Sequence, residues 1–291
     1  MSLDDLNNVL LYPSGVKRIA VCLYGCYRTG DYVLPWLKKS LTHPDVHVDY
    51  FCSARNYDEY RTVSRQKPEK IYRSDDQLIE KLSILNPTSV EIQDYEITRK
   101  YNGAAATEKS MADAIMLKQI HEATTGIEYD IVLLARYDTL AAPMASLAKH
   151  IATIGSLLTY GPNGRNPLHG KDLICNARGA WIGTCRQQHG LVHSPWADSV
   201  HDYFVVGSSV AMDIIAMEFL KQINPNAENY KSGIALRHTH MTLGTIIRQQ
   251  DIQLLDCMFV RSTIIRPYAD LTLDPTIPIN FNKLEIAFRD E

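Results

Sequence analysis

The chain has 291 residues, of which 45% are hydrophobic and 22% charged, a composition typical of one large α/β domain or two small ones and not of a disordered protein. Its formal net charge of −3 and the lack of a dense Lys/Arg block argue against nucleic acid as a partner. No apolar run approaches the roughly 20 residues that cross a bilayer. Because residues 1–5 are acidic where a signal peptide is basic, we expect a cytoplasmic protein without a transmembrane segment.

The cysteines favour a reduced protein. None of the six forms a CxxC pair, and several lie in apolar runs, which suits buried free thiols better than a zinc site or a disulfide framework. They are Cys22, Cys26, Cys52, Cys175, Cys185 and Cys257.

The first half of the chain alternates strand-like and helix-like segments. Short apolar, β-branched runs predict strands, and apolar residues at helical spacing predict helices. Ser74, followed three residues later by Gln77, is a capping-box signature for one of these helices. In chain order we expect strand 17–23, helix 31–40, strand 46–51, helix 75–85, strand 89–92, helix 102–124 and strand 130–134. This alternation predicts an α/β fold with a mainly parallel, Rossmann-type sheet covered by helices on both faces.

The second half is less regular. Residues 161–178 are rich in Gly, Pro and Asn, which predicts a long functional loop. We expect strand 156–160, strand 180–183, strand 203–206, helix 209–222, helix 238–250 and strand 252–255. No internal repeat or convincing linker divides the chain, so we expect a single domain with an irregular tail after Pro267.

The segment after the first expected strand has features of an anion site. In Tyr24-Gly25-Cys26-Tyr27-Arg28-Thr29-Gly30, the glycines allow a tight turn, and the following helix N-terminus favours an anion. Gly25, Arg28 and Thr29 are the candidate binding residues, and Arg28 offers a fork of donors suited to phosphate. The segment is neither a dinucleotide fingerprint nor a P-loop. The alternative is an ordinary turn with Arg28 on the surface.

A carboxylate follows another buried strand. Arg136 and Asp138 come directly after the expected strand 130–134, where ligands of open α/β sheets bind. Mg²⁺ and Mn²⁺ prefer oxygen ligands and commonly take one or two carboxylates, with phosphates and water completing the shell. Asp138 is therefore a candidate metal ligand, and Arg136 is a candidate binding residue like Gly25, Arg28 and Thr29. The alternative is an aspartate that caps the next turn.

Polar candidates also occur later in the chain. Trp196 suits stacking on a sugar, and Asp198 or Asp202 could act as a general base toward an acceptor hydroxyl, although a loop of solvated charges has the same composition. His238 and His240 are spaced i,i+2, so they do not share a helical face. Either histidine alone could reach a metal or a phosphate, or could be structural.

In order and spacing, these segments resemble bacterial and viral polysaccharide glycosyltransferases with a GT-A-like fold. The resemblance is carried by G-x-x-R-T-G after the first strand, by Y-D-x-V-x-x-x-R-x-D at 129–138, and by D-Y-F-V-V-G-S-S at 202–209. It implies a nucleotide-sugar half at about 17–150, with Arg28 and Asp138 on the donor side. It also implies an acceptor half at 151–266, with Asp202 near the acceptor, and a C-terminal tail at 267–291.

The implied activity is transfer of a sugar from a nucleoside-diphosphate sugar to a glycan or other hydroxyl acceptor, assisted by Mn²⁺ or Mg²⁺ and either inverting or retaining. These glycosyltransferases often carry a Pro-Glu pair before the last helix, whereas this chain has Leu236 to His240 there, so His240 is a candidate metal ligand in place of the glutamate. Two alternatives stay open. One is another nucleotide-using α/β transferase, and the other is a non-catalytic or degenerate nucleotide-sugar-binding domain.

Overall fold

The computed structural model describes residues 18–42, 44, 46–60, 69–98, 101, 103–142, 173–179, 204–223, 239–250 and 252–264. Its strands are β1 (Arg18–Cys26), β2 (His47–Arg55), β3 (Tyr57–Tyr60), β4 (Glu69–Tyr72), β5 (Ser89–Gln93), β6 (Ile131–Arg136), β7 (Thr139–Ala142), β8 (Leu173–Gly179), β9 (Phe204–Gly207) and β10 (Gln253–Ile264). Its helices are α2 (Gly30–Leu41), α3 (Asp75–Leu82), the 3₁₀ helix η1 (Ser83–Leu85), α4 (Tyr95–Thr98), α5 (Gly103–Thr125), α8 (Ser209–Gln222) and α9 (Thr239–Gln249). None of the described helices has the length and apolar character needed to cross a membrane.

An eight-stranded sheet forms the middle of the molecule, in the order β5-β2-β1-β6-β9-β8-β10-β7. The strands β5, β2, β1 and β6 run parallel to one another, as predicted for the first half. The second half adds antiparallel pairs, because β9 is antiparallel to both β6 and β8, and β7 is antiparallel to β10. The α/β class is confirmed, and the sheet is continuous across the two predicted halves.

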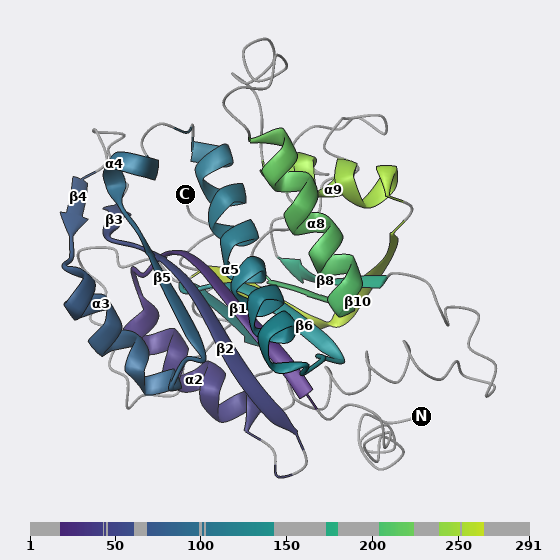
Figure 1. The fold of residues 1–291 in the computed structure, drawn as a ribbon, viewed down its shortest axis with the longest axis horizontal. Helices are drawn as coiled ribbons and strands as arrows, with labels where there is room; N and C mark the ends of the chain where they lie inside the picture. The colour runs from purple at the N-terminus through teal and green to yellow at the C-terminus, as the bar shows by residue number, and fades with distance from the viewer. Residues whose placement is uncertain are drawn as a thin grey trace.

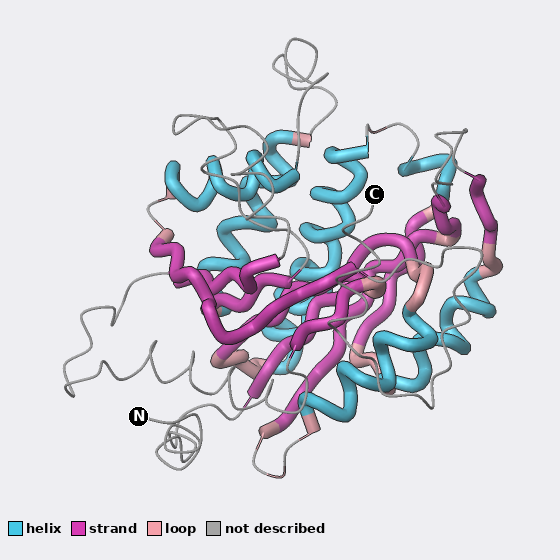
Figure 2. The backbone as a smooth tube through the Cα atoms, turned by 180° about the vertical axis from the view of Figure 1, so that it is seen from behind, coloured by secondary structure: helices cyan, strands magenta, loops and turns pink. Residues whose placement is uncertain are grey.

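Helices cover both faces of the parallel strands. In Figures 1 and 2 the strands cross the middle of the molecule between α2 and α3 on one side and α5, α8 and α9 on the other. Side chains of β1 alternate between these layers: Ile19, Val21 and Leu23 pack in the cluster with α2 and α3, whereas Cys22 and Tyr24 pack with α5 and α8. Since both faces are buried, the strand has a nearly continuous apolar sequence.

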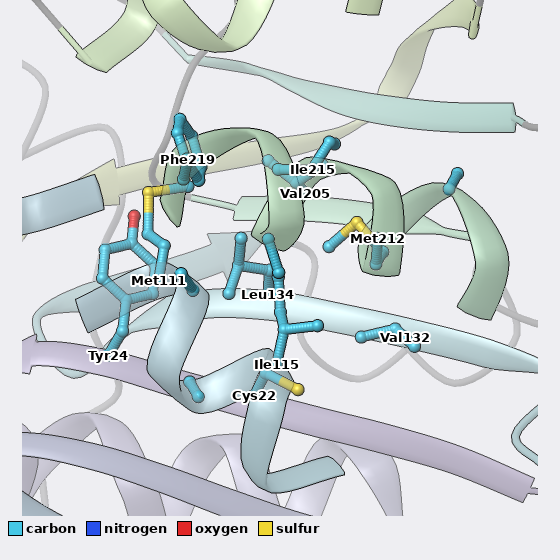
Figure 3. Close-up of a cluster of buried hydrophobic side chains, with 14 of the residues drawn as sticks. Cys22, Tyr24, Met111, Ile115, Val132, Leu134, Val205, Met212, Ile215 and Phe219 are labelled. Atoms are coloured by element: carbon cyan, nitrogen blue, oxygen red, sulfur yellow. The ribbon is translucent and has the colours of Figure 1, made fainter. Parts of the chain in front are cut away.

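The second layer is built mainly by α5 and α8. Figure 3 shows Met111 and Ile115 of α5 beside Met212, Ile215 and Phe219 of α8, above the strands β6 and β9. All five side chains are fully buried. This packing fixes the position of α5 against the sheet.

The expected elements agree closely with the structure in several places. Helices expected at 31–40, 102–124, 209–222 and 238–250 are confirmed as α2, α5, α8 and α9. The long loop expected at 161–178 is wrong for its last residues, because β8 pairs there with β9 and β10. The ribbon β3–β4, the strand β7 and the short helix α4 were not expected. Strands 156–160 and 180–183 and the tail after Pro267 lie outside the described residues.

The described cysteine side chains agree with the prediction of free thiols. Cys22, Cys26 and Cys52 are buried and free. Burial raises the pKa of the Cys52 thiol to about 12, so this sulfur stays protonated and packs as an apolar group.

The capping box of α3 is confirmed. The Ser74 hydroxyl accepts a hydrogen bond from the Gln77 amide at 3.2 Å, and the Gln77 side chain accepts one from the Ser74 amide at 3.0 Å. We expect Ser74→Ala to lower the free energy of unfolding in urea by about 1 kcal/mol, because it leaves an amide of the first turn without its partner. Thr124→Ala is the control, since that exposed hydroxyl donates to the Ile120 and His121 carbonyls and leaves no backbone amide without a partner when it is removed. Equal losses for both variants would show that the cap contributes nothing specific.

Candidate functional site

The order of the parallel strands creates a switch point beside β1. The chain runs outward from β1 to β2 and β5, then returns so that β6 lies on the other side of β1. In open α/β sheets, ligands bind outside the carboxyl ends of the strands where the order reverses. Arg28 follows β1, while Arg136 ends β6 and Asp138 comes two residues later. The structure therefore brings two of the predicted segments together at this point.

These side chains form a three-residue ion cluster, which we call the arginine clamp (Arg28, Arg136 and Asp138). The Arg28 Nη1 atom donates to Asp138 Oδ2 at 2.6 Å. Arg136 donates through Nε to Oδ1 at 2.8 Å and through Nη2 to Oδ2 at 2.9 Å. The Asp138 side chain is 1% exposed, and the two arginine side chains are 15% and 16% exposed. Two guanidinium groups thus share one carboxylate, and these three side chains together carry a net charge of +1.

The ionisation of Asp138 follows from its neighbours. Burial by itself would raise its pKa, but the positive charges of Arg136 and Arg28, and their hydrogen bonds, outweigh burial and hold the pKa of Asp138 well below its usual range. Asp138 is therefore a permanent acceptor at neutral pH. Its chemical role in this arrangement is to orient the two arginines.

The same contacts test whether the clamp could hold a metal. Both carboxylate oxygens of Asp138 already accept hydrogen bonds from guanidinium groups, and a divalent cation bound there would lie beside two positive charges. The described residues include no group of three or more His, Cys, Asp or Glu side chains that could hold a metal ion. His240 lies in the first turn of α9, and its side chain is outside the described part. The clamp fits an anion and not a cation, and metal binding stays a prediction.

The turn between β1 and α2 sets the position of Arg28. Gly25 has a φ of +96° and Arg28 a φ of +42°, so the chain turns sharply after the strand. A left-handed conformation is costly for a residue other than glycine. Thr29 is buried and precedes the first residue of α2. A Cβ atom on Gly30 would lie 2.6 Å from the Tyr27 ring, so this glycine is required by packing.

Sequence reasoning missed the residues that hold this turn. The buried Asp58 accepts a hydrogen bond from the Arg28 amide at 2.7 Å, and its other oxygen accepts two from the Arg73 guanidinium at 3.0 and 2.8 Å. The expected strand 46–51 ends too early, because β2 continues to Arg55. Arg28 was selected because it follows the carboxyl end of a strand, where ligands bind. Had β2 been expected to end at Arg55, the same reasoning would also have selected Asp58.

Unused hydrogen-bonding groups accompany the clamp. Within the described part of the chain, Arg28 Nε and Thr139 Oγ1 are buried and have no hydrogen-bond partner. Thr139 directly follows Asp138 and begins β7. A guanidinium N–H and a hydroxyl both donate to phosphate oxygens. The site thus combines a net positive charge with donors that a bound anion could satisfy.

The acceptor side of the predicted site is not placed. Asp198 and Asp202 lie outside the described residues, so the structure shows no contact between either carboxylate and the clamp. No model of a known protein family and no curated protein matches the chain.

Proposed function

We propose that this protein is a glycosyltransferase with a GT-A-type fold, and that the arginine clamp binds the diphosphate of a nucleoside-diphosphate sugar. The observation that carries the proposal is the position of a net +1 cluster, with unused buried donors, at the switch point of the parallel sheet. Guanidinium forks match phosphate geometry and are favoured wherever phosphate is bound bidentately.

The clamp suits the charge changes of sugar transfer. The bond between the sugar and the diphosphate breaks, the sugar joins the acceptor oxygen, and negative charge develops on the departing diphosphate. Arg28 and Arg136 stabilise that charge, and because Asp138 already fixes their orientation, little reorganisation is needed. We assign the proton of the acceptor hydroxyl to Asp202 or Asp198 as general base. Residues 17–150 form the donor half in this proposal, and 151–266 the acceptor half.

The first test is nucleotide binding. We expect UDP or GDP to bind the wild-type protein in isothermal titration calorimetry, and Arg136→Met to weaken binding at least about tenfold, because a charge-assisted hydrogen bond is lost. Arg18→Met is the matched control, since Arg18 lies at the opposite end of β1 from the clamp. If neither nucleotide binds with or without Mn²⁺, or if both variants bind equally well, the donor site is not at the clamp.

Turnover separates this proposal from its alternatives. The proposal predicts hydrolysis or transfer from a UDP-sugar or GDP-sugar, and parallel assays with Mn²⁺ and with a chelator determine whether a metal takes part. Donor binding without turnover for any acceptor would support a degenerate binding domain. Thermal stabilisation by S-adenosylmethionine, with none by nucleotide sugars, would support a different transferase.

A further inference from the structure

A third arginine lies at the same edge of the sheet as the two of the clamp, and it was not among the predicted site residues. Arg55 is the last residue of β2, and it is paired in the parallel ladder with Cys26, the last residue of β1. Arg28 is two residues beyond Cys26. The carboxyl ends of adjacent parallel strands share one edge of a sheet, so Arg55 and the arginine clamp lie at the same edge.

The Arg55 side chain is held firmly on the side of the sheet that α5 covers. Its Nε donates to Ser110 Oγ at 3.2 Å, and its Nη1 lies 4.0 Å from the Cys26 sulfur. Ser110 in turn donates to Gln93 Oε1 at 2.5 Å, and the Gln93 amide donates to Asp113. This chain of hydrogen bonds fixes the guanidinium plane, which is a typical arrangement for a binding residue.

Cys26 connects Arg55 to the clamp. Its sulfur contacts Arg55, and Cys26 precedes Arg28 by two residues at the end of β1. Arg55 therefore lies beside the last residue of β1, two positions before Arg28.

The charge of Arg55 has no partner in the described structure. The residue is only 8% exposed, yet among the described residues it forms no ion pair, and its Nη2 atom is buried without a hydrogen-bond partner. The nearest carboxylate in its hydrogen-bond chain, Asp113, is paired with Lys109 at 2.6 Å. Burying a charge without a counter-charge is costly, so such a group is expected where a ligand supplies the opposite charge.

We infer that Arg55 binds a second anionic group of the ligand held by the arginine clamp, so that the binding site extends from β6 across β1 to the end of β2. The inference rests on the proposed donor site, and it assigns a binding residue for a ligand with at least two anionic groups. A diphosphate meets this requirement, and so does a nucleotide sugar that carries a carboxylate.

The test compares inorganic phosphate with inorganic diphosphate in isothermal titration calorimetry. We expect diphosphate to bind the wild-type protein more tightly than phosphate. Arg55→Met should weaken diphosphate binding at least about tenfold and leave phosphate binding unchanged, because the variant loses only the contact with the second anionic group. Arg136→Met should weaken the binding of both phosphate and diphosphate. Arg55→Lys keeps the positive charge but lacks the forked donors of a guanidinium group. Its affinity for diphosphate should lie between those of the wild type and Arg55→Met.

Thermal unfolding without ligand distinguishes a binding role from a structural one. Because Arg55→Met removes a buried charge without a partner, we expect its Tm to equal or exceed that of the wild type. Arg73→Met is the matched control: it should lower Tm, since it removes both guanidinium hydrogen bonds to the buried Asp58. A lower Tm for Arg55→Met, together with an unchanged ratio of diphosphate to phosphate affinity, would assign Arg55 a structural role and overturn the inference.

The same variants locate the second anionic group. UDP-glucose and UDP-glucuronate differ in the carboxylate of the sugar. If Arg55→Met weakens diphosphate and both UDP-sugars alike, Arg55 binds a phosphate; if it weakens only UDP-glucuronate, Arg55 binds the sugar carboxylate. Equal affinities of wild type and Arg55→Met for all three ligands would overturn the inference while leaving the clamp as the donor site. If the inorganic anions bind but no UDP-sugar or GDP-sugar does, the proposed function fails and the role of Arg55 in anion binding stands.

Discussion

Replacing Asp138 with asparagine is expected to lower the free energy of unfolding by about 3 kcal/mol at pH 7. The substitution leaves Arg28 and Arg136 beside one another with no carboxylate between them, although both guanidinium groups are largely buried. Removing one partner of a buried ion cluster leaves uncompensated charge, which accounts for the size of the loss. Urea unfolding followed by circular dichroism measures it.

The pH dependence of this loss has a definite sign. The pKa of Asp138 is lower in the folded protein than in the unfolded chain, so the unfolded chain binds the additional proton. The stabilisation is therefore fully present above the unfolded pKa of about 3.9 and disappears as the pH falls below it. We expect the stability difference between wild type and D138N to be constant from pH 7 to pH 5 and to shrink below about pH 4.

An exposed aspartate provides the control for Asp138. Asp31 accepts a 2.7 Å ion pair from Lys81, but the two side chains are 49% and 30% exposed. Asp31→Asn should therefore change the free energy of unfolding by less than about 1 kcal/mol. Losses of similar size for both aspartates would mean that the clamp is not a buried, mutually supporting cluster.

The second large effect is expected at Lys118. This lysine is completely buried between α5 and α8, where its Nζ atom lies 2.8 Å from Glu122 Oε2 and 2.8 Å from Asp213 Oδ1. It also donates to the hydroxyl of Ser209. Lys118→Met leaves two carboxylates together without a cation, and we expect it to lower the free energy of unfolding by about 3–5 kcal/mol at pH 7. Chemical denaturation is the measurement.

Acid should partly rescue the Lys118 variant. Burial raises the pKa of Asp213, while Lys118 counteracts that rise, so removing the lysine raises the pKa further. When the pKa of a carboxyl is higher in the folded protein than in the unfolded chain, the folded protein binds the additional proton. The folded protein therefore becomes more stable relative to the unfolded chain as the pH falls. The stability deficit of K118M should therefore be smaller at pH 5 than at pH 7.

Lys221 offers the matched control for Lys118. It pairs with Glu218 at 2.6 Å, but its side chain is 63% exposed. Lys221→Met should change the free energy of unfolding by less than about 1 kcal/mol and show no rescue in acid. A K118M variant as stable as K221M would show that the buried lysine network does not hold α5 to α8.

The parallel half of the fold could be predicted because its signals are local. A buried parallel strand requires an unbroken apolar run, and α3 begins where expected because the Ser74 side chain accepts from the Gln77 amide. The end of β2 could not be predicted, since residues 52–55 are only partly apolar and their pairing with β1 and β5 keeps them extended. That error concealed both Arg55 and Asp58.

The sequence predicted which residues lie at the candidate site, but it did not predict the contacts between them. Arg28 and Asp138 each follow a buried strand, which marks both as ligand candidates. Their 2.6 Å ion pair joins residues 110 positions apart, and it depends on the register of β1 against β6. Sequence alone cannot supply that register, so Asp138 was expected to bind a cation, whereas the structure places it between two arginines.

The fixed geometry of the clamp affects the thermodynamics of binding. A free arginine side chain loses roughly 2 kcal/mol of rotamer entropy when it is immobilised. In this protein Asp138 immobilises Arg28 and Arg136 during folding, so most of that entropy is lost before a ligand arrives. A bound diphosphate would gain the enthalpy of the charged hydrogen bonds with little further ordering of these side chains, and calorimetry would show this as a small entropic penalty.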